Sequence, residues 1–95
     1  MPSYLIESYL PRSRTGELPA VVGRLRRATE SLTAEGTLVR HMRSTFLPHD
    51  ELCLHVLEAE SAATASEASR RAAIEPARVV QALPVASSEA PGGAP

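Results

Sequence analysis

The sequence predicts one α+β domain, in which two helices cover a single face of a four-stranded antiparallel sheet. Its 95 residues allow one core, and its hydrophobic fraction of 43% is that of a globular chain. Alternating apolar residues indicate strands at residues 3–9, 37–47, 52–58 and 78–85. Apolar residues at helical spacing indicate helices at residues 17–35 and 61–73.

The first strand, residues 3–9, contains aromatic and aliphatic residues and no strand breaker. Residues 11–16 are expected to form a loop. The first helix opens near Glu17, with Pro19 in its first turn, where the missing backbone N–H costs no hydrogen bond. Gly36 is well placed to end this helix in the left-handed conformation.

The second half of the chain begins with a strand that turns at residues 48–51 into the third strand. Ser61 can cap the second helix, and Thr64 begins a rival capping motif one turn later. Alanines make up the buried side of this helix, so it is expected to lie close to the sheet. Pro84 weakens the last strand.

This order of strands and helices is the β-α-β-β-α-β pattern of the ferredoxin-like fold, with the first and third strands side by side in the middle. We expect this domain to span residues 1–85. Residues 86–95 contain Ser, Glu, Pro, Gly, Ala and no large side chain, which is typical of a disordered tail. Because two helices cover only one face, we expect a second copy of the chain to cover the open face in a homodimer.

Alternation along the strands predicts which side chains point to this open face, the sheet surface away from the helices. The third strand is expected to face the helices with Leu52, Leu54 and Val56. Cys53 and His55 then point to the open face. In the first strand, Ile6 is expected to face the helices, while Glu7 and Tyr9 point to the open face.

The second strand is expected to turn its most apolar side chains, Leu38, Met42 and Phe46, toward the helices. His41 and Arg43 then lie on the open face. This orientation needs an odd number of residues in the hairpin loop. An even loop would reverse the strand, because a shift of one residue exchanges its two faces.

Four side chains gathered in this way suit a metal ion: Glu7, His41, Cys53 and His55. Imidazole, thiolate and carboxylate groups bind nickel, copper or zinc. The alternative is a purely structural role, because the spacing of Cys53 and His55 is not that of a tight metal motif. Arg43 adds a permanent cation that opposes a metal ion and favours a carboxylate, either Glu7 or a small anionic ligand bound against Arg43 and Tyr9.

Other classes of protein are disfavoured. The formal net charge of -1 argues against nucleic-acid binding, and every apolar run is shorter than a membrane span. The single cysteine and the absence of a visible secretory signal favour a cytoplasmic protein. A Cys53–His55 nucleophile pair is conceivable, but successive side chains on one strand face point in parallel, so we expect no catalysis.

Several blocks of the sequence carry a family resemblance: Tyr4–Pro11, Val39–Phe46, Leu52–Leu54 with Glu58–Ala59, Ala72–Ile74 and Arg78–Val80. Over about residues 3–83 the chain resembles domain-of-unknown-function family 4242, a group of small actinobacterial-type proteins. Arg43, Ala68 and Ala73 stand where many members have His, His and Gly. The resemblance implies the ferredoxin-like fold, a dimer and nickel binding. We therefore expect a small dimeric protein that binds nickel or another divalent metal, with a non-metal ligand-binding or accessory domain as the alternative.

Overall fold

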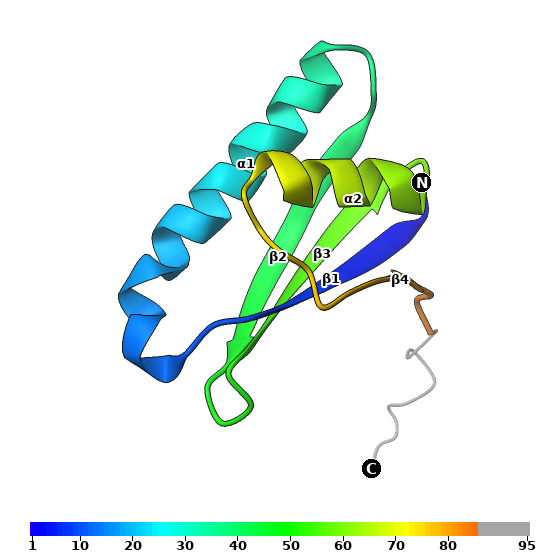
Figure 1. The fold of residues 1–95 in the computed structure, drawn as a ribbon. Coiled ribbons are helices and arrows are strands. Elements are labelled where there is room, and N and C mark those ends of the chain that lie inside the picture. The colour runs from blue at the N-terminus through cyan, green and yellow to red at the C-terminus, as the bar shows by residue number, and fades with distance from the viewer. Residues whose placement is uncertain (86–95) are drawn as a thin grey trace.

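The computed structural model describes residues 1–85 and has the α+β ferredoxin-like fold (Figure 1). Its elements are β1 (Ser3–Tyr9), the short 3-10 helix η1 (Arg12–Glu17), α1 (Leu18–Ala34), β2 (Val39–Leu47), β3 (Leu52–Ala59), α2 (Ala62–Arg71) and β4 (Arg78–Ala82). The tail expected at residues 86–95 lies outside the described residues. Both helices of the α type lie on the same side of the sheet.

The sheet has four strands in the order β2-β3-β1-β4, and every neighbouring pair is antiparallel. The first and third strands therefore lie in the middle, as the order of elements predicted. Within residues 1–85, no helix combines the length and the apolar character needed to cross a membrane.

Local sequence signals set the ends of the helices. Pro19 lies in the first turn of α1, and Gly36 follows its end with a φ of +102°, which a residue with a side chain rarely adopts. Ser61 caps α2, because its side-chain oxygen accepts a hydrogen bond from the Thr64 N–H at 3.2 Å. The rival cap at Thr64 is therefore wrong. The loop expected before α1 is mostly the 3-10 helix η1.

The core lies between the sheet and the two helices. Ile6, Leu25 and Leu57 are fully buried there, with α1 supplying most of the large side chains on the helical side. The face that α2 turns to the sheet is made of small residues, among them Ala65 and Ala68, both completely buried. Because alanine side chains are short, α2 packs close to the strands, as expected from the sequence.

The orientation expected for β3 is wrong. Cys53, His55, Leu57 and Ala59 are buried beneath the helices, whereas Leu52, Leu54 and Val56 are half-buried on the open face. The register decides this, because His55 pairs with Ile6 of β1 and paired residues share a face. Both faces of β3 carry apolar side chains, so alternation alone did not identify the buried one. For β1 the expectation is confirmed, since Ile6 is buried and Glu7 lies on the open face.

The orientation expected for β2 is partly wrong. Phe46 pairs with Cys53 and faces the helices, as expected, although the hairpin loop of residues 48–51 is even. A bulge between His41 and Arg43 then shifts the register, so His41 also faces the helices. Arg43 pairs with Val56 on the open face, as expected. Leu38 and Met42, which were expected inside, are exposed.

Replacing the cap of α2 tests this account of its start. We expect Ser61→Ala to lower the free energy of unfolding by about 1 kcal/mol, because the Thr64 N–H loses its partner. Urea denaturation measures the change. Ser66→Ala, an exposed position inside the same helix, is the matched control and should leave stability unchanged or slightly raised. An equal loss in both variants would contradict the cap.

Candidate functional site

A row of polar side chains lies between the sheet and α1, where an ordinary core would be apolar. Three strands supply its members: Ser8 from β1, Cys53 and His55 from β3, and His41 and Ser44 from β2. The strand register aligns them, because Ser8 pairs with Cys53 and Ser44 pairs with His55. Buried polar groups are costly unless they are hydrogen-bonded, so this row calls for a functional explanation.

Three of these side chains form a hydrogen-bonded group, which we call the His41–Ser44–His55 network. The Ser44 Oγ lies 2.8 Å from His41 Nε2 and 2.6 Å from His55 Nδ1. The outer nitrogens, His41 Nδ1 and His55 Nε2, are buried and have no hydrogen-bond partner in the described part of the chain. His55 is 0% exposed. An unpartnered buried nitrogen costs about 1–3 kcal/mol, so the fold retains this group at the expense of stability.

A small cavity adjoins the network. It is partly open to solvent, and we call it the internal cavity because it lies between α1 and the sheet. It has a volume of about 100 Å³ and is lined by Leu18, Val22, Ser44, Thr45, Phe46, Cys53 and His55. A neighbouring cavity of about 150 Å³ shares Cys53 as a lining residue and also contacts Ser8, Tyr9 and Arg24. His55 thus lines a cavity whose other walls are largely apolar.

The electrostatic surroundings keep both histidines neutral. Burial, and secondarily the neighbouring His41, lower the pKa of His55 to about 4. Burial also lowers the pKa of His41, helped by the positive charge of Arg26. The pKa of the Cys53 thiol is raised by burial, although the nearby Ser8 hydroxyl opposes this. At neutral pH the site therefore offers two neutral imidazoles and a protonated thiol.

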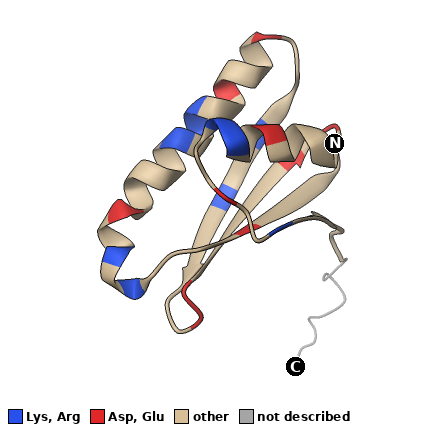
Figure 2. Cartoon of the chain, viewed as in Figure 1, with Lys and Arg blue, Asp and Glu red and all other residues tan. Residues whose placement is uncertain are grey.

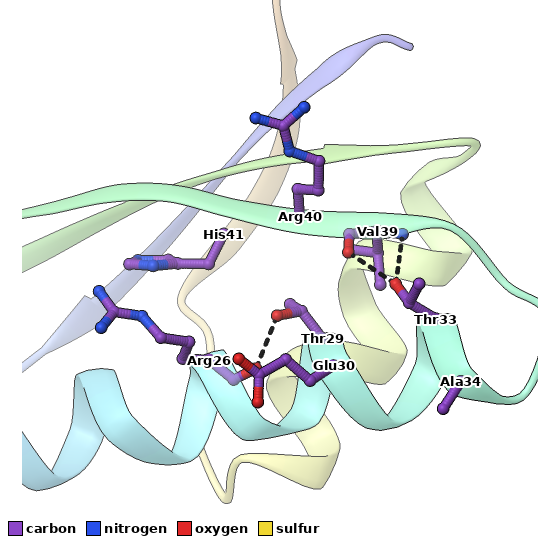
Figure 3. Close-up of a pocket in the computed structure, with 8 residues that line it drawn as sticks. All are labelled: Arg26, Thr29, Glu30, Thr33, Ala34, Val39, Arg40 and His41. Carbon is purple, nitrogen blue, oxygen red and sulfur yellow. Dashed lines mark hydrogen bonds between the residues drawn. The ribbon is translucent and has the colours of Figure 1, made fainter.

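On its other side the network borders an open groove between α1 and β2, the α1–β2 groove (Figure 3). Its volume is about 540 Å³, and its lining includes Arg26, Thr29, Glu30 and His41. Figure 3 shows the Arg26 side chain beside the His41 ring, whereas Arg40 extends away from α1. Basic positions lie in the middle of α1, and an acidic position follows them towards its C-terminal end (Figure 2).

The four predicted metal ligands do not form one site. Glu7 lies on the opposite face of the sheet, where its carboxylate pairs with Arg78 at 2.8 Å. His41 is paired with Leu57, four residues along β3 from Cys53, a separation of about 13 Å. Only Cys53 and His55 share a cavity. Within residues 1–85, no group of three or more His, Cys, Asp or Glu side chains is arranged to hold a metal ion.

The two residues predicted to hold an anionic ligand, Tyr9 and Arg43, both lie on the open face but far apart. Tyr9 is paired with Leu52 and Arg43 with Val56, positions separated by about 13 Å along β3. The expected pairing of Glu7 with Arg43 is wrong, because Glu7 binds Arg78 instead. Tyr9 does line the 150 Å³ cavity.

Sequence reasoning missed Ser44 and Arg26. Ser44 meets His55 in the register set by the hairpin, and the bulge between His41 and Arg43 turns His41 to the same face, where it contacts Ser44. No sequence motif marks that bulge. Arg26 is an exposed residue of α1. Its place beside His41 follows from the packing of α1 against β2, which spacing along the chain does not specify.

Comparisons with known proteins support the fold. No protein-family model and no curated protein sequence matches the chain. The crystal structure of SCO4226 from Streptomyces coelicolor A3(2) is similar, with a TM-score of 0.66 at 12% sequence identity. The match covers 88% of this chain and 99% of SCO4226. At this identity, the similarity shows a shared fold.

The low pKa of His55 predicts a loss of stability in acid. The unfolded chain, in which the pKa returns to about 6.5, binds a proton more readily than the folded chain, where it is about 4. The free energy of unfolding should therefore fall as the pH drops from about 6.5 to about 4. The fall is as much as about 3 kcal/mol, since each pKa unit corresponds to about 1.4 kcal/mol.

Urea denaturation between pH 7.5 and 4 measures this dependence. His55→Gln should flatten the curve, whereas His49→Gln, in the exposed hairpin turn, should leave it as steep as in the native protein. Parallel curves for the native protein and His55→Gln would show that burial of His55 does not govern the acid response.

Proposed function

We propose that this protein binds a small ligand in the internal cavity, with His55 Nε2 as the polar contact. The unpartnered Nε2 of a completely buried histidine, beside a cavity, carries this proposal. Ligand sites are typically apolar cavities with a few directed polar groups. Ser44 holds the imidazole by its other nitrogen, which fixes the direction of the unpartnered one.

The lining indicates the chemistry of the ligand. Leu18, Val22 and Phe46 suit a small apolar body, and His55 suits one hydroxyl, carbonyl or carboxyl group. A volume of about 100 Å³ holds only a few non-hydrogen atoms. A longer ligand would extend past Cys53 into the neighbouring cavity of about 150 Å³. We assign no catalytic step to the site.

A divalent transition metal, nickel or a similar ion, is the second candidate occupant. The observation in its favour is that Cys53 and His55 line the same cavity. A hydrogen bond from the other ring nitrogen, such as the one to Ser44, is common for metal-bound histidines. Two protein ligands leave positions for water or an exogenous ligand, and the raised pKa of the Cys53 thiol makes its deprotonation costly.

We further propose that a second copy of the chain covers the open face. Its four strands present half-buried aliphatic side chains: Leu5, Leu47, Leu52, Leu54, Val56 and Val80. Charged pairs lie among and beside them: Glu7, opposite Leu54 in the register, pairs with Arg78, and Arg40 pairs with Glu58. Protein interfaces combine apolar and polar contacts, and the two signs of charge allow a symmetric copy to pair with itself.

The size of the face supports a dimer. Four strands spaced about 4.8 Å apart and about 25 Å long present on the order of 500 Å² in projection. The accessible area of a surface with projecting side chains is larger, close to the roughly 800 Å² per partner of a standard interface.

We also propose a cytoplasmic location and membership of family 4242. A free, buried thiol as the one cysteine supports the location. The sequence blocks that resemble family 4242 and the ferredoxin-like fold support this membership. Membership would in turn imply nickel binding.

A thermal-shift screen separates the two candidate occupants of the internal cavity. Short alcohols, ketones and carboxylic acids form one panel, and Ni²⁺ and Zn²⁺ form the other. We expect a member of the organic panel to raise the melting temperature with increasing concentration, since a ligand of the folded state stabilises it by mass action. His55→Phe should abolish this response, whereas Cys53→Ser should retain it.

A metal site gives a different result. Stabilisation by Ni²⁺ or Zn²⁺ with one ion per chain in native mass spectrometry, lost in both Cys53→Ser and His55→Phe, would favour the metal. His49→Gln is the control for exposed histidine. If neither panel stabilises the native protein, the cavity is not a binding site for either class.

Light scattering coupled to size-exclusion chromatography tests the dimer. The native protein should have twice the chain mass of 10.1 kDa. Leu54→Arg, at the centre of the open face, should yield monomers because a charge would be buried without a partner. Leu38→Arg, the same change at a position outside the sheet that is 53% exposed, should remain dimeric. A monomeric native protein across the dilution series would refute the interface.

A further inference from the structure

We propose that the α1–β2 groove binds a small oxyanion, and that the His41–Ser44–His55 network couples this groove to the internal cavity. The two spaces lie at opposite ends of one row of hydrogen bonds: His41 lines the groove and His55 lines the cavity. Each end carries an unpartnered, buried ring nitrogen.

The chemistry of the groove favours an oxyanion. Arg26 is exposed and lies beside the His41 ring (Figure 3). Within the described part of the chain its guanidinium pairs with no carboxylate, whereas Arg40 pairs with Glu58 at 3.7 Å. A carboxylate or phosphate oxygen between Arg26 and His41 would accept from both. Because His41 Nδ1 is covered in this structure, the proposal requires the exposed Arg26 side chain to move aside as the anion binds. Glu30, which also lines the groove, confines the anion to the Arg26 end.

The coupling follows from counting protons. Each neutral imidazole carries one ring proton, and the Ser44 hydroxyl donates one hydrogen bond. In the first arrangement, His41 Nε2–H donates to Ser44 and Ser44 donates to His55 Nδ1, so His55 Nε2 carries a proton and His41 Nδ1 does not. In the second, every bond is reversed. A third, in which both rings donate to Ser44, leaves the serine proton without a partner.

An oxyanion selects the second arrangement, because it needs a proton on His41 Nδ1. His41 Nε2 then accepts from the Ser44 hydroxyl, and Ser44 accepts from His55 Nδ1–H. His55 Nε2 is then unprotonated, and it can only accept a hydrogen bond. Relative to the first arrangement, one proton is lost at His55 Nε2 and one is gained at His41 Nδ1, so the net charge of the network does not change.

An occupant of the groove therefore sets whether the cavity presents a hydrogen-bond donor or an acceptor. The low pKa values of both histidines agree with this, since the coupling requires both rings to be neutral at neutral pH. The inference concerns the protein without a cavity ligand, so its test is independent of the proposed function.

Nitrogen-15 NMR of the histidine rings tests the proposal. Inorganic phosphate and acetate are the probes, at constant ionic strength with sodium chloride as the reference, and the tighter one identifies the class of anion. We expect the anion to convert His41 Nδ1 to the protonated type and, in parallel, His55 Nε2 to the unprotonated type. Arg26→Gln should weaken binding about tenfold, and Glu30→Gln should tighten it.

Variants of Ser44 and a neighbouring arginine complete the test. Arg27→Gln, the same charge change on an adjacent exposed residue that does not line the groove, should bind like the native protein. Ser44→Ala should still bind the anion at His41 while His55 no longer responds, and Ser44→Thr, which keeps a hydroxyl, should restore the response. A groove without anion binding, equal weakening by Arg27→Gln, or an unresponsive His55 in the native protein would each overturn the proposal.

Discussion

The pairing of β1 with β3 is the constraint on which the rest of this structure depends. Backbone hydrogen bonds place Ile6 opposite His55, and residues opposite each other in a sheet share a face. Since Ile6 belongs to the core beneath the helices, His55 must enter the core as well. Alternate residues of a strand point to the same face, so Cys53, Leu57 and Ala59 are buried on the same side as His55.

Once His55 is inside, its surroundings determine its chemistry. Water no longer solvates the ring, so the neutral form is favoured and the pKa falls to about 4. One nitrogen finds Ser44 at 2.6 Å, which in turn contacts His41 at 2.8 Å. The other nitrogen remains unpartnered beside the internal cavity. An apolar residue here would leave no buried nitrogen without a partner, and the retained imidazole is the observation that supports the proposed ligand site.

The same register gives the open face its character. With Cys53 and His55 turned inward, the larger aliphatic residues of β3, Leu52, Leu54 and Val56, remain on the side without helices. An uncovered sheet face of this composition differs from the polar outer face of a typical two-layer domain. The two faces of β3 are thus the reverse of the sequence-based prediction: Cys53 and His55 are inside, and Leu52, Leu54 and Val56 are on the open face.

The sequence by itself determined the number and order of the strands and α-helices, although not the short 3-10 helix η1. Pro19, Gly36 and Ser61 are local signals whose effect depends on a few neighbouring residues, so the ends of α1 and the start of α2 could be predicted from them. The ferredoxin-like topology followed from that order. Of the candidate site, the sequence identified His41, Cys53 and His55 as unusual residues, and it placed Glu7 wrongly among them.

Only the tertiary structure decided which face of each strand is buried and which polar residues meet. Both faces of β3 are apolar enough to enter a core, so the choice was made by its pairing with β1 across most of the chain length. The bulge in β2 is a further non-local effect, because the one extra residue is fixed by the partner strand and brings His41 rather than Met42 opposite Leu57. Local patterns carry no information on such register, since it arises from hydrogen bonds between strands that are distant in sequence.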